Sequence, residues 1–246
     1  LQRATVLTAA SGDLARKMVM LLGQDPGVEV IPNAVDTALF TPGPADPALR
    51  QRLGIQPDEL VLGFSGELRH KKGTPFLFSA LSEVRKARPA CLLVIGEVRA
   101  RDLELLSSFR AEHPEDAARI LVSGRLDAPE DVAAHLRLCD VYLQPSLWDG
   151  MPNAMLEAMA CARVVIASDA GGIPEAVEHE RNGFLVPKAL LNHLGQALVD
   201  VLSLSEERRA AIGAAARARI EERFQARAEA EALQRVLDRA IPKASS

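Results

Sequence analysis

The sequence has few cysteines, no long apolar run and little charge imbalance. Its three cysteines, Cys91, Cys139 and Cys161, have none of the spacings found in zinc sites or redox pairs. The five histidines are equally scattered, which argues against a histidine-based metal site. We therefore expect the cysteines to be small buried side chains in a protein from a reducing compartment.

Other absences exclude whole classes of protein. No apolar run reaches the ~18 residues of a membrane-spanning helix. The 29 basic and 33 acidic residues give a net charge of -4, so the broad basic surface of a nucleic-acid-binding protein is missing. Hydrophobic residues make up 48% of the 246 positions, enough for one or two domains that need no disulfide or metal staple. We expect a cytoplasmic globular protein.

Short apolar runs alternate with amphipathic segments along most of the chain. The runs cover residues 60–64, 91–95, 120–122, 141–143, 164–166 and 184–186. Strands buried on both faces of a parallel sheet have this pattern of consecutive apolar residues. Helices are predicted near residues 74–87, 101–111, 129–138, 153–161 and 189–203. The alternation predicts an α/β fold with a doubly wound parallel sheet of about six strands.

Both ends of the chain depart from this alternation. The N-terminal part predicts strands at 5–8 and 28–31 and a helix over about 13–22 that Ser11 would cap. Two strands and one helix cannot bury a core alone, and the chain begins without Met. We therefore expect residues 1–47 to be the remnant of an N-terminal domain plus a proline-rich linker. Residues 48–225 would form the α/β domain, and residues 226–246 a C-terminal helix and tail.

The segment over residues 145–160 reads PSLWDGMPNAMLEAMA and follows a predicted strand. Gly150 permits a tight turn, and Pro152 suits the first turn of a helix. The backbone amides of Asn153, Ala154 and Met155 would then lack helical partners. Because the helix dipole favours anions there by ~0.3–1 kcal/mol, the segment predicts a phosphate site at the C-terminal edge of the sheet.

Two carboxylates flank this helix start. Asp149 lies just before it, and Glu157 lies about one turn inside it. A carboxylate can accept hydrogen bonds from two hydroxyls at once, which suits the vicinal diols of a sugar or ribose. Either acid alone would be interpreted as a helix cap or an ordinary helical residue. Together with the phosphate site, the ordered pair favours binding of a nucleotide-sugar.

The sequence resembles the retaining nucleotide-sugar glycosyltransferases of the GT-B fold, family four or group 1. Residues 149–157 are similar to the family's Glu-x7-Glu motif, 30–36 to its interdomain IPNGVD and 66–73 to its GRLxxxKG loop. Residues 167–175 and 182–187 resemble AxxxGGxxE and NGxLVP. The resemblance covers about residues 5–225. It implies the Rossmann-like, donor-binding C-terminal half of a hexosyltransferase-type enzyme whose N-terminal acceptor domain is missing.

The resemblance also implies a role for each matching residue. Asp149 would contact the transferred sugar, and Lys72 would neutralise the pyrophosphate leaving group; these two are the catalytic residues. Glu157 would hold the ribose hydroxyls. The other donor-binding residues would be Gly66 and Arg69, then Gly150, Met151, Pro152, Asn153, Ala154 and Met155, and at the nucleobase Gly124, Arg125 and Leu126.

No metal or cofactor is expected, since the sequence has no Asp-x-Asp motif and a lysine with a helix N-terminus can replace a divalent cation. The expected partners are a nucleotide-sugar donor and the missing N-terminal domain, and not a nucleic acid. Membrane-associated acceptors are common in such families, so peripheral membrane association of the full-length protein is left open.

Several residues depart from the family pattern. Asp149 replaces a glutamate, and Glu67 replaces an arginine, so we expect Glu67 to point away from the phosphates or to pair with Arg69. Ala34 and Ala162 replace glycines, which is tolerable unless φ is positive there. Two further expectations are that the glycines at 171 and 172 allow close approach of a ligand, and that Glu175 is an acid in the first turn of a helix.

Two other functions remain open at this point. One is a stand-alone nucleotide-binding or nucleotide-sugar-binding module that is inactive without a partner domain or chain. The other is an epimerase of the same fold. A phosphorylase would need a pyridoxal lysine, for which no motif stands out. A glycosidase reaction through Asp149 and Glu157 would leave the phosphate-loop pattern unexplained.

Overall fold

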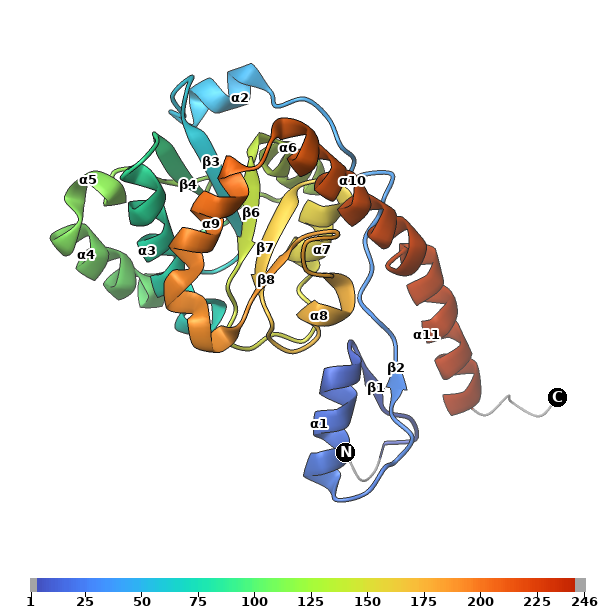
Figure 1. The fold of residues 1–246 in the computed structure, drawn as a ribbon. Coiled ribbons are helices and arrows are strands. Elements are labelled where there is room, and N and C mark those ends of the chain that lie inside the picture. Colours follow the sequence, from blue (N-terminus) through green and yellow to red (C-terminus); the bar gives the residue numbers. More distant parts are fainter. Residues whose placement is uncertain (1–3, 242–246) are drawn as a thin grey trace.

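The computed structural model describes residues 4–241. For Arg101 it describes the backbone and not the side chain. Its centre is a six-stranded sheet in which every neighbouring pair is parallel, with strand order β5-β4-β3-β6-β7-β8 (Figure 1). The strands are β3 (Leu60–Ser65), β4 (Ala90–Ile95), β5 (Ile120–Val122), β6 (Val141–Gln144), β7 (Val164–Ser168) and β8 (Phe184–Val186). The six predicted apolar runs and the doubly wound α/β fold are confirmed.

Helices cover both faces of the sheet, and each face has its own hydrophobic core (Figure 1). On one face lie α2 (Pro47–Arg52), α6 (Pro129–Leu138), α7 (Asn153–Ala160), α8 (Ile173–Ala176) and α10 (Glu206–Arg223). On the other lie α3 (Thr74–Arg85), α4 (Leu103–Glu112) and α9 (Leu194–Ser203), with α5 (Pro114–Ala117) beside α3 and α4. Three 3-10 helices span His70–Lys72, Ala100–Asp102 and Lys188–His193. Burial on both sides explains why the strand sequences are continuously apolar.

The N-terminal residues form a small unit beside the main domain. It contains β1 (Thr8–Ala9), α1 (Gly12–Leu22) and β2 (Glu29–Val30), and its two strands pair in parallel. Ser11 caps α1 as predicted, since its hydroxyl accepts a hydrogen bond from the Leu14 amide at 3.2 Å. Met20 and Leu21 on this helix are about four-fifths exposed, so the unit leaves apolar surface uncovered.

The linker after β2 lies against the main domain, where two partly buried arginine side chains donate hydrogen bonds to it. Arg217 of α10 donates to the carbonyl oxygens of Thr37 and Phe40, and Arg137 of α6 donates to that of Thr41. After α10 the chain turns into α11 (Ala226–Ala240), which reaches back to the N-terminal unit, where Arg239 pairs with Glu29 (Figure 1). The α10–α11 junction also contacts the linker, because the Val35 amide donates to the Phe224 carbonyl oxygen at 2.9 Å.

The three cysteines are buried and free of disulfides, as expected. Burial raises the pKa of the Cys91 thiol to about 12 and that of the Cys161 thiol to about 11, so both are unreactive thiols at neutral pH.

Of the two alanines that replace glycines, Ala162 meets the condition under which the replacement is costly. Its φ is +55°, in the left-handed region that a Cβ disfavours, whereas Ala34 has no positive φ. None of the helices in the described part of the chain is long and apolar enough to cross a membrane.

Candidate functional site

The candidate site lies at the C-terminal edge of β3 and β6, the two central strands where the strand order reverses. In open α/β sheets, ligands bind beside such a reversal, because the loops from the two strands diverge there and leave a crevice. Three segments meet at this edge: the loop of residues 66–73 after β3, the loop of residues 145–152 after β6, and the N-terminus of α7. Both predicted catalytic residues, Lys72 and Asp149, lie on these segments.

The two predicted catalytic side chains contact each other. The ammonium nitrogen of Lys72 lies 2.6 Å from Oδ2 of Asp149, and both side chains are mostly buried. Two backbone features bring the loops together. The Leu147 amide donates to the Lys71 carbonyl oxygen at 2.9 Å, and a Cβ on Gly73 would lie 1.9 Å from the Pro145 carbonyl oxygen. Only glycine fits at position 73, where φ is +78°.

The N-terminus of α7 presents free backbone donors. The helix begins at Asn153, as predicted, and Pro152 is its N-cap residue. The amides of Met151, Asn153 and Ala154 have no acceptor among the described residues. The prediction that the Met155 amide is also free is wrong, because it donates to the Pro152 carbonyl oxygen at 3.1 Å. The start of the helix therefore offers three free amides to an anion, with that of Met151 in place of that of Met155.

Glu157 carries a half-buried carboxylate on the same helix. Burial raises its pKa, and within residues 4–241 no side chain or amide donates to it. A carboxylate that is desolvated and left without a donor destabilises the fold unless a ligand supplies the missing hydrogen bonds. This arrangement favours binding of a ligand with hydroxyl groups, such as a ribose.

Glu67 is neutralised by arginines, as the sequence predicted. Its carboxylate pairs with Nε of Arg69, and its other oxygen lies 2.7 Å from Nη1 of Arg99. Arg99, which comes from the loop after β4, was not predicted to be near the site. Its position could not be read from the sequence, since β4 joins β3 only through sheet pairing.

The residues predicted to border the nucleobase lie at the end of β5. Gly124 has a φ of +76° and bridges to Gly96 at the end of β4. Arg125 is exposed and pairs with Asp127 at 2.8 Å, whereas Leu126 packs against the core. These residues lie two strands from β3, at the outer end of the same edge.

Four polar residues near the site were missed by the sequence reasoning. Gln144 and Ser146 are buried, and Ser146 donates to Oδ2 of Asp149 at 3.2 Å. Buried Ser168 donates to the Ser146 carbonyl oxygen at 2.5 Å. Asn33 of the linker donates to the Met151 carbonyl oxygen at 2.7 Å. The available signal was a polar residue at the end of an apolar strand, as at Gln144 and Ser168.

The glycines at 171 and 172 allow close approach of the protein's own backbone, and the expected approach of a ligand there stays a prediction. A Cβ on Gly171 would lie 1.6 Å from the Asp149 carbonyl oxygen, and one on Gly172 would lie 2.1 Å from that of Gly150. Glu175 is in the first turn of α8, as expected. It also caps α1, accepting from the amides of Gly12 and Asp13 at 3.1 Å each.

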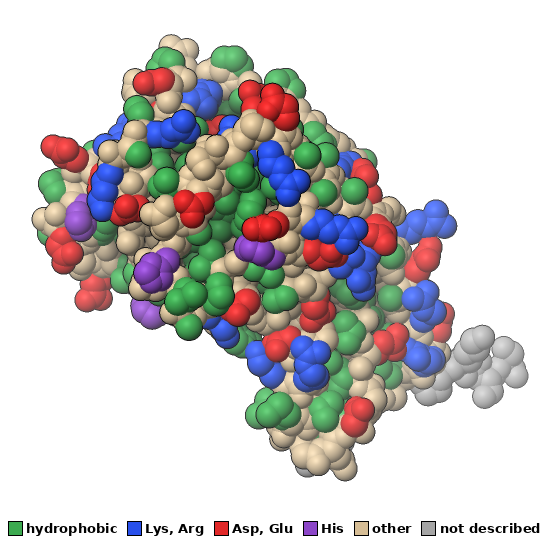
Figure 2. Space-filling view, in the orientation of Figure 1, with side chains coloured by type: hydrophobic (Ala, Val, Ile, Leu, Met, Phe, Trp, Pro, Cys, Tyr) green, Lys and Arg blue, Asp and Glu red, His purple; other side chains and the backbone are tan. Residues whose placement is uncertain are grey.

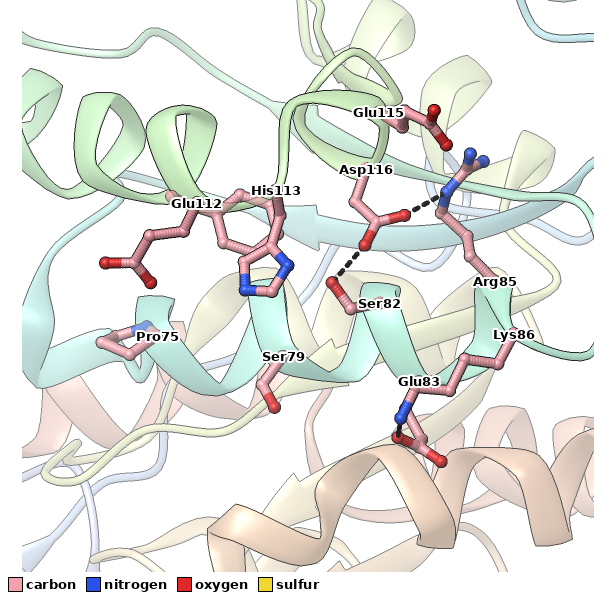
Figure 3. A pocket seen from close by; sticks show the side chains of 11 residues that line it. Pro75, Ser79, Ser82, Glu83, Arg85, Lys86, Glu112, His113, Glu115 and Asp116 are labelled. Atoms are coloured by element: carbon pink, nitrogen blue, oxygen red, sulfur yellow. Dashed lines mark hydrogen bonds and ion pairs between the residues drawn. The ribbon is translucent and has the colours of Figure 1, made fainter.

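A separate groove of about 490 Å³ lies between α3, α4 and α5 (Figure 3). Several of its polar groups pair with one another: Asp116 accepts from Ser82 and Arg85, and Lys86 pairs with Glu83. Figure 2 shows Lys and Arg side chains interspersed with Asp and Glu on the face it presents. Neither feature brings together a set of unpaired groups like that at the sheet edge.

Comparison with known proteins bears on the same residues. Residues 59–203 match the family described as glycosyl transferases group 1, and this range contains Lys72, Asp149 and Glu157. The chain belongs to the group 1 glycosyltransferases. The expected family and fold are thereby confirmed, including the GT-B half with its Rossmann-like, nucleotide-sugar-binding domain.

Two curated relatives show how this glycosyltransferase chain compares in length. It is 32% identical to a GDP-mannose-dependent monoacylated alpha-(1-6)-phosphatidylinositol monomannoside mannosyltransferase of Corynebacterium glutamicum, over 88% of this chain and 57% of the relative. It is 33% identical to a D-inositol 3-phosphate glycosyltransferase of Kineococcus radiotolerans, over 98% of this chain and 58% of the relative. The chain thus spans little more than half the length of these enzymes.

Two solved structures locate the matching half. Anabaena HepE in complex with UDP and glucose matches with a TM-score of 0.80 at 25% identity, covering 96% of this chain and 63% of that one. The C-terminal domain of a group 1 family glycosyl transferase from Francisella tularensis matches with a TM-score of 0.68 at 25% identity, covering 78% of this chain and 99% of that one. The glycosyltransferase fold described above is therefore that of a C-terminal domain in this family.

Proposed function

We propose that this chain is the donor-binding part of a retaining glycosyltransferase, which moves a hexosyl group from a nucleotide-sugar to an acceptor hydroxyl. One observation carries the proposal. The free amides at the start of α7, the Lys72 ammonium and the unpartnered Glu157 carboxylate meet at one sheet edge. They match the phosphates and the ribose of such a donor in charge and hydrogen-bonding capacity.

The proposed chemistry depends on charge that grows during transfer. As the bond between sugar and phosphate breaks, negative charge develops on the departing diphosphate. The Lys72 ammonium and the amides of Met151, Asn153 and Ala154 are fixed donors beside that position, and fixed donors stabilise developing charge strongly. We propose that these groups replace a divalent cation, so that donor binding needs no metal.

The other roles follow from the positions of the groups. Glu157 accepts hydrogen bonds from the ribose hydroxyls, Asp149 contacts the transferred sugar, and the segment Gly124–Leu126 borders the nucleobase. The relatives differ in their donors: the Corynebacterium enzyme is named as GDP-mannose-dependent, and HepE was solved with UDP. The base and the sugar are therefore left to experiment.

Acceptor binding is assigned to the part that the relatives have beyond this match. The chain covers 41–58% of the first three curated relatives, so we expect it to bind a donor and to transfer sugar poorly by itself. The runner-up function is a stand-alone nucleotide-binding module that is inactive without a partner domain or chain. Mixing this chain with the N-terminal part of a relative and assaying sugar transfer tests the assignment of acceptor binding, and robust transfer by this chain alone would contradict it.

The direct test is a thermal-shift panel of UDP, GDP, ADP, dTDP and their sugars, each measured with and without EDTA. A ligand at 100 times its Kd stabilises the fold by ~2.7 kcal/mol. We expect one base to raise the melting temperature equally with and without EDTA. Glu157→Ala should abolish the shift, and Glu104→Ala, at an exposed acid of α4, should preserve it. If no nucleotide shifts the wild-type chain, the proposal is wrong.

A further inference from the structure

A hydrogen-bond chain runs through the buried interior to Asp149. The Ser65 amide lies 3.3 Å from the Tyr142 hydroxyl, and that hydroxyl lies 3.2 Å from Oε1 of Gln144. Nε2 of Gln144 lies 2.8 Å from the Ser146 hydroxyl, which lies 3.2 Å from Oδ2 of Asp149. Tyr142, Gln144 and Ser146 are all at most 1% exposed.

The chain has one direction of donation. A backbone amide can only donate, so the Tyr142 hydroxyl accepts a hydrogen bond from Ser65. The same hydroxyl therefore donates its hydrogen bond to Oε1 of Gln144. The Gln144 amide group then faces Ser146 with its nitrogen, which also can only donate. The single proton of the Ser146 hydroxyl is therefore left for Asp149. Successive donors polarise one another in a buried chain, and this one ends on a charged acceptor.

Asp149 is consequently held by three donors. Oδ2 accepts from Ser146 and from Lys72, and Oδ1 accepts from the Gly150 amide at 3.1 Å. An ionised carboxylate has about four lone-pair sites, so roughly one acceptor position remains, on Oδ1. The direction in which that position points is fixed by the contact at Oδ2.

We propose that Ser146 is a positioning residue, whose buried hydroxyl orients Asp149 so that Oδ1 is open to a hydroxyl of the donor sugar. The inference rests on the proposed donor site and adds a determinant of sugar recognition to it. Ser146 acts through Asp149 and touches no ligand itself. Its removal should therefore weaken binding of the sugar part while leaving binding of the diphosphate part intact.

The experiment compares two pairs of ligands on four versions of the chain. Isothermal titration gives Kd for UDP with UDP-glucose and for GDP with GDP-mannose, in the wild type, Ser146→Ala, Ser146→Cys and Ser168→Ala. Ser168 is the matched control, a buried hydroxyl bonded to the Ser146 carbonyl oxygen but not to Asp149.

In Ser146→Ala we expect the nucleotide-sugar Kd to rise roughly tenfold, the loss of one hydrogen bond to a charged group, with the diphosphate Kd changed less than about twofold. The Cys variant, a weaker donor, should be intermediate. Equal weakening of both ligands, or an unchanged ratio between them, overturns the proposal. So does a matching loss of the sugar preference in Ser168→Ala.

A second measurement does not depend on any nucleotide. Amine labelling followed by mass spectrometry compares Lys72 with its exposed neighbour Lys71 in the same chain. If Ser146 holds the pair, Ser146→Ala raises the labelling ratio of Lys72 to Lys71 and Ser168→Ala does not. An unchanged ratio in Ser146→Ala rejects the positioning role. If the ratio rises but no nucleotide binds the wild type, the proposed function fails and the orienting role of Ser146 stands.

Discussion

The ammonium of Lys72 and the carboxylate of Asp149 are ion-paired at 2.6 Å, although 77 positions separate them in the sequence. The lysine proposed to neutralise the leaving phosphate is therefore already neutralised by the acid proposed to contact the sugar. A donor entering the site must share Lys72 with Asp149.

The first prediction concerns this pair. Asp149→Asn removes a negative charge beside the phosphate position and frees Lys72, so a nucleoside diphosphate should bind a few-fold tighter, corresponding to ~0.5–1 kcal/mol. The extra affinity that the sugar part confers should disappear. Titration calorimetry of the diphosphate and the nucleotide-sugar checks this. In the control Lys72→Met, diphosphate binding should change in the opposite direction. Weaker diphosphate binding in the Asn variant would contradict the competition.

The second prediction concerns the pH dependence of stability. Burial raises the pKa of Glu157 above its ordinary value of 4.5, so the folded chain holds this proton more tightly than the unfolded chain does. The contribution of this group to the free energy of unfolding is therefore lost as pH rises from about 4.5 through the raised pKa. At pH 7 the melting temperature of Glu157→Gln should exceed that of the wild type by on the order of 1–3 °C. At pH 4 the two melting temperatures should be the same.

The same variant should bind nucleotide weakly, because a neutral amide is a poorer acceptor for two hydroxyls. Scanning calorimetry at both pH values, with Glu104→Gln as control, tests the stability part. A variant that is less stable at pH 7 would mean that the Glu157 carboxylate has a stabilising partner in the protein.

The third prediction concerns Glu67. Its carboxylate pairs with Arg69 and Arg99, which limits the positive charge available to phosphates. Glu67→Gln should tighten diphosphate binding about threefold at low salt and make binding more sensitive to salt, since exposed ion pairs are screened. Glu97→Gln is the control, because among the described residues the only ion-pair partner of Glu97 is Arg99. The measurement is Kd against salt concentration, and equal effects of the two variants would reject a special role for Glu67.

The fourth prediction separates backbone strain from crowding. Gly171 and Gly54 both have positive φ, +56° and +71°, but only at Gly171 would a Cβ meet backbone, the Asp149 carbonyl oxygen. Gly54→Ala should cost ~1 kcal/mol of unfolding free energy. Gly171→Ala should cost more than about 2 kcal/mol, because the loop of Asp149 must move. Urea unfolding of both variants gives the comparison, and similar costs would show that the contact is easily relieved.

The fifth prediction concerns Ala162, whose φ of +55° strains the backbone. Ala162→Gly should raise the free energy of unfolding by ~0.5–1 kcal/mol, since the relief of strain outweighs the added freedom of the unfolded chain. The same change at Ala214, an exposed site inside α10, should lower it by a similar amount. Urea unfolding again gives both values; a loss at Ala162 would mean that its Cβ makes packing contacts worth more than the strain.

Much of the fold was predictable from local pattern. The apolar runs that became β3 to β8 and the cap at Ser11 depend on neighbours a few residues away, which the sequence displays directly. The position of the site at one sheet edge was also predictable, because the carboxyl ends of parallel strands meet there. The bonding of single amides was less predictable: the Met155 amide donates to the Pro152 carbonyl oxygen, which depends on the geometry of one turn of backbone.

The amino-acid pattern alone predicted an α/β chain and a helix start between two acids that suits a phosphate, and it carried a resemblance that the family match confirms. Three features became visible only in the folded chain. Lys72 forms an ion pair with Asp149, and Arg99 forms one with Glu67. Gly171 and Gly172 allow close approach to the backbone of the Asp149 loop. The physical reason is that these contacts join segments far apart in the chain. Their distances are set by sheet order and loop packing, which a pattern of neighbouring residues does not encode.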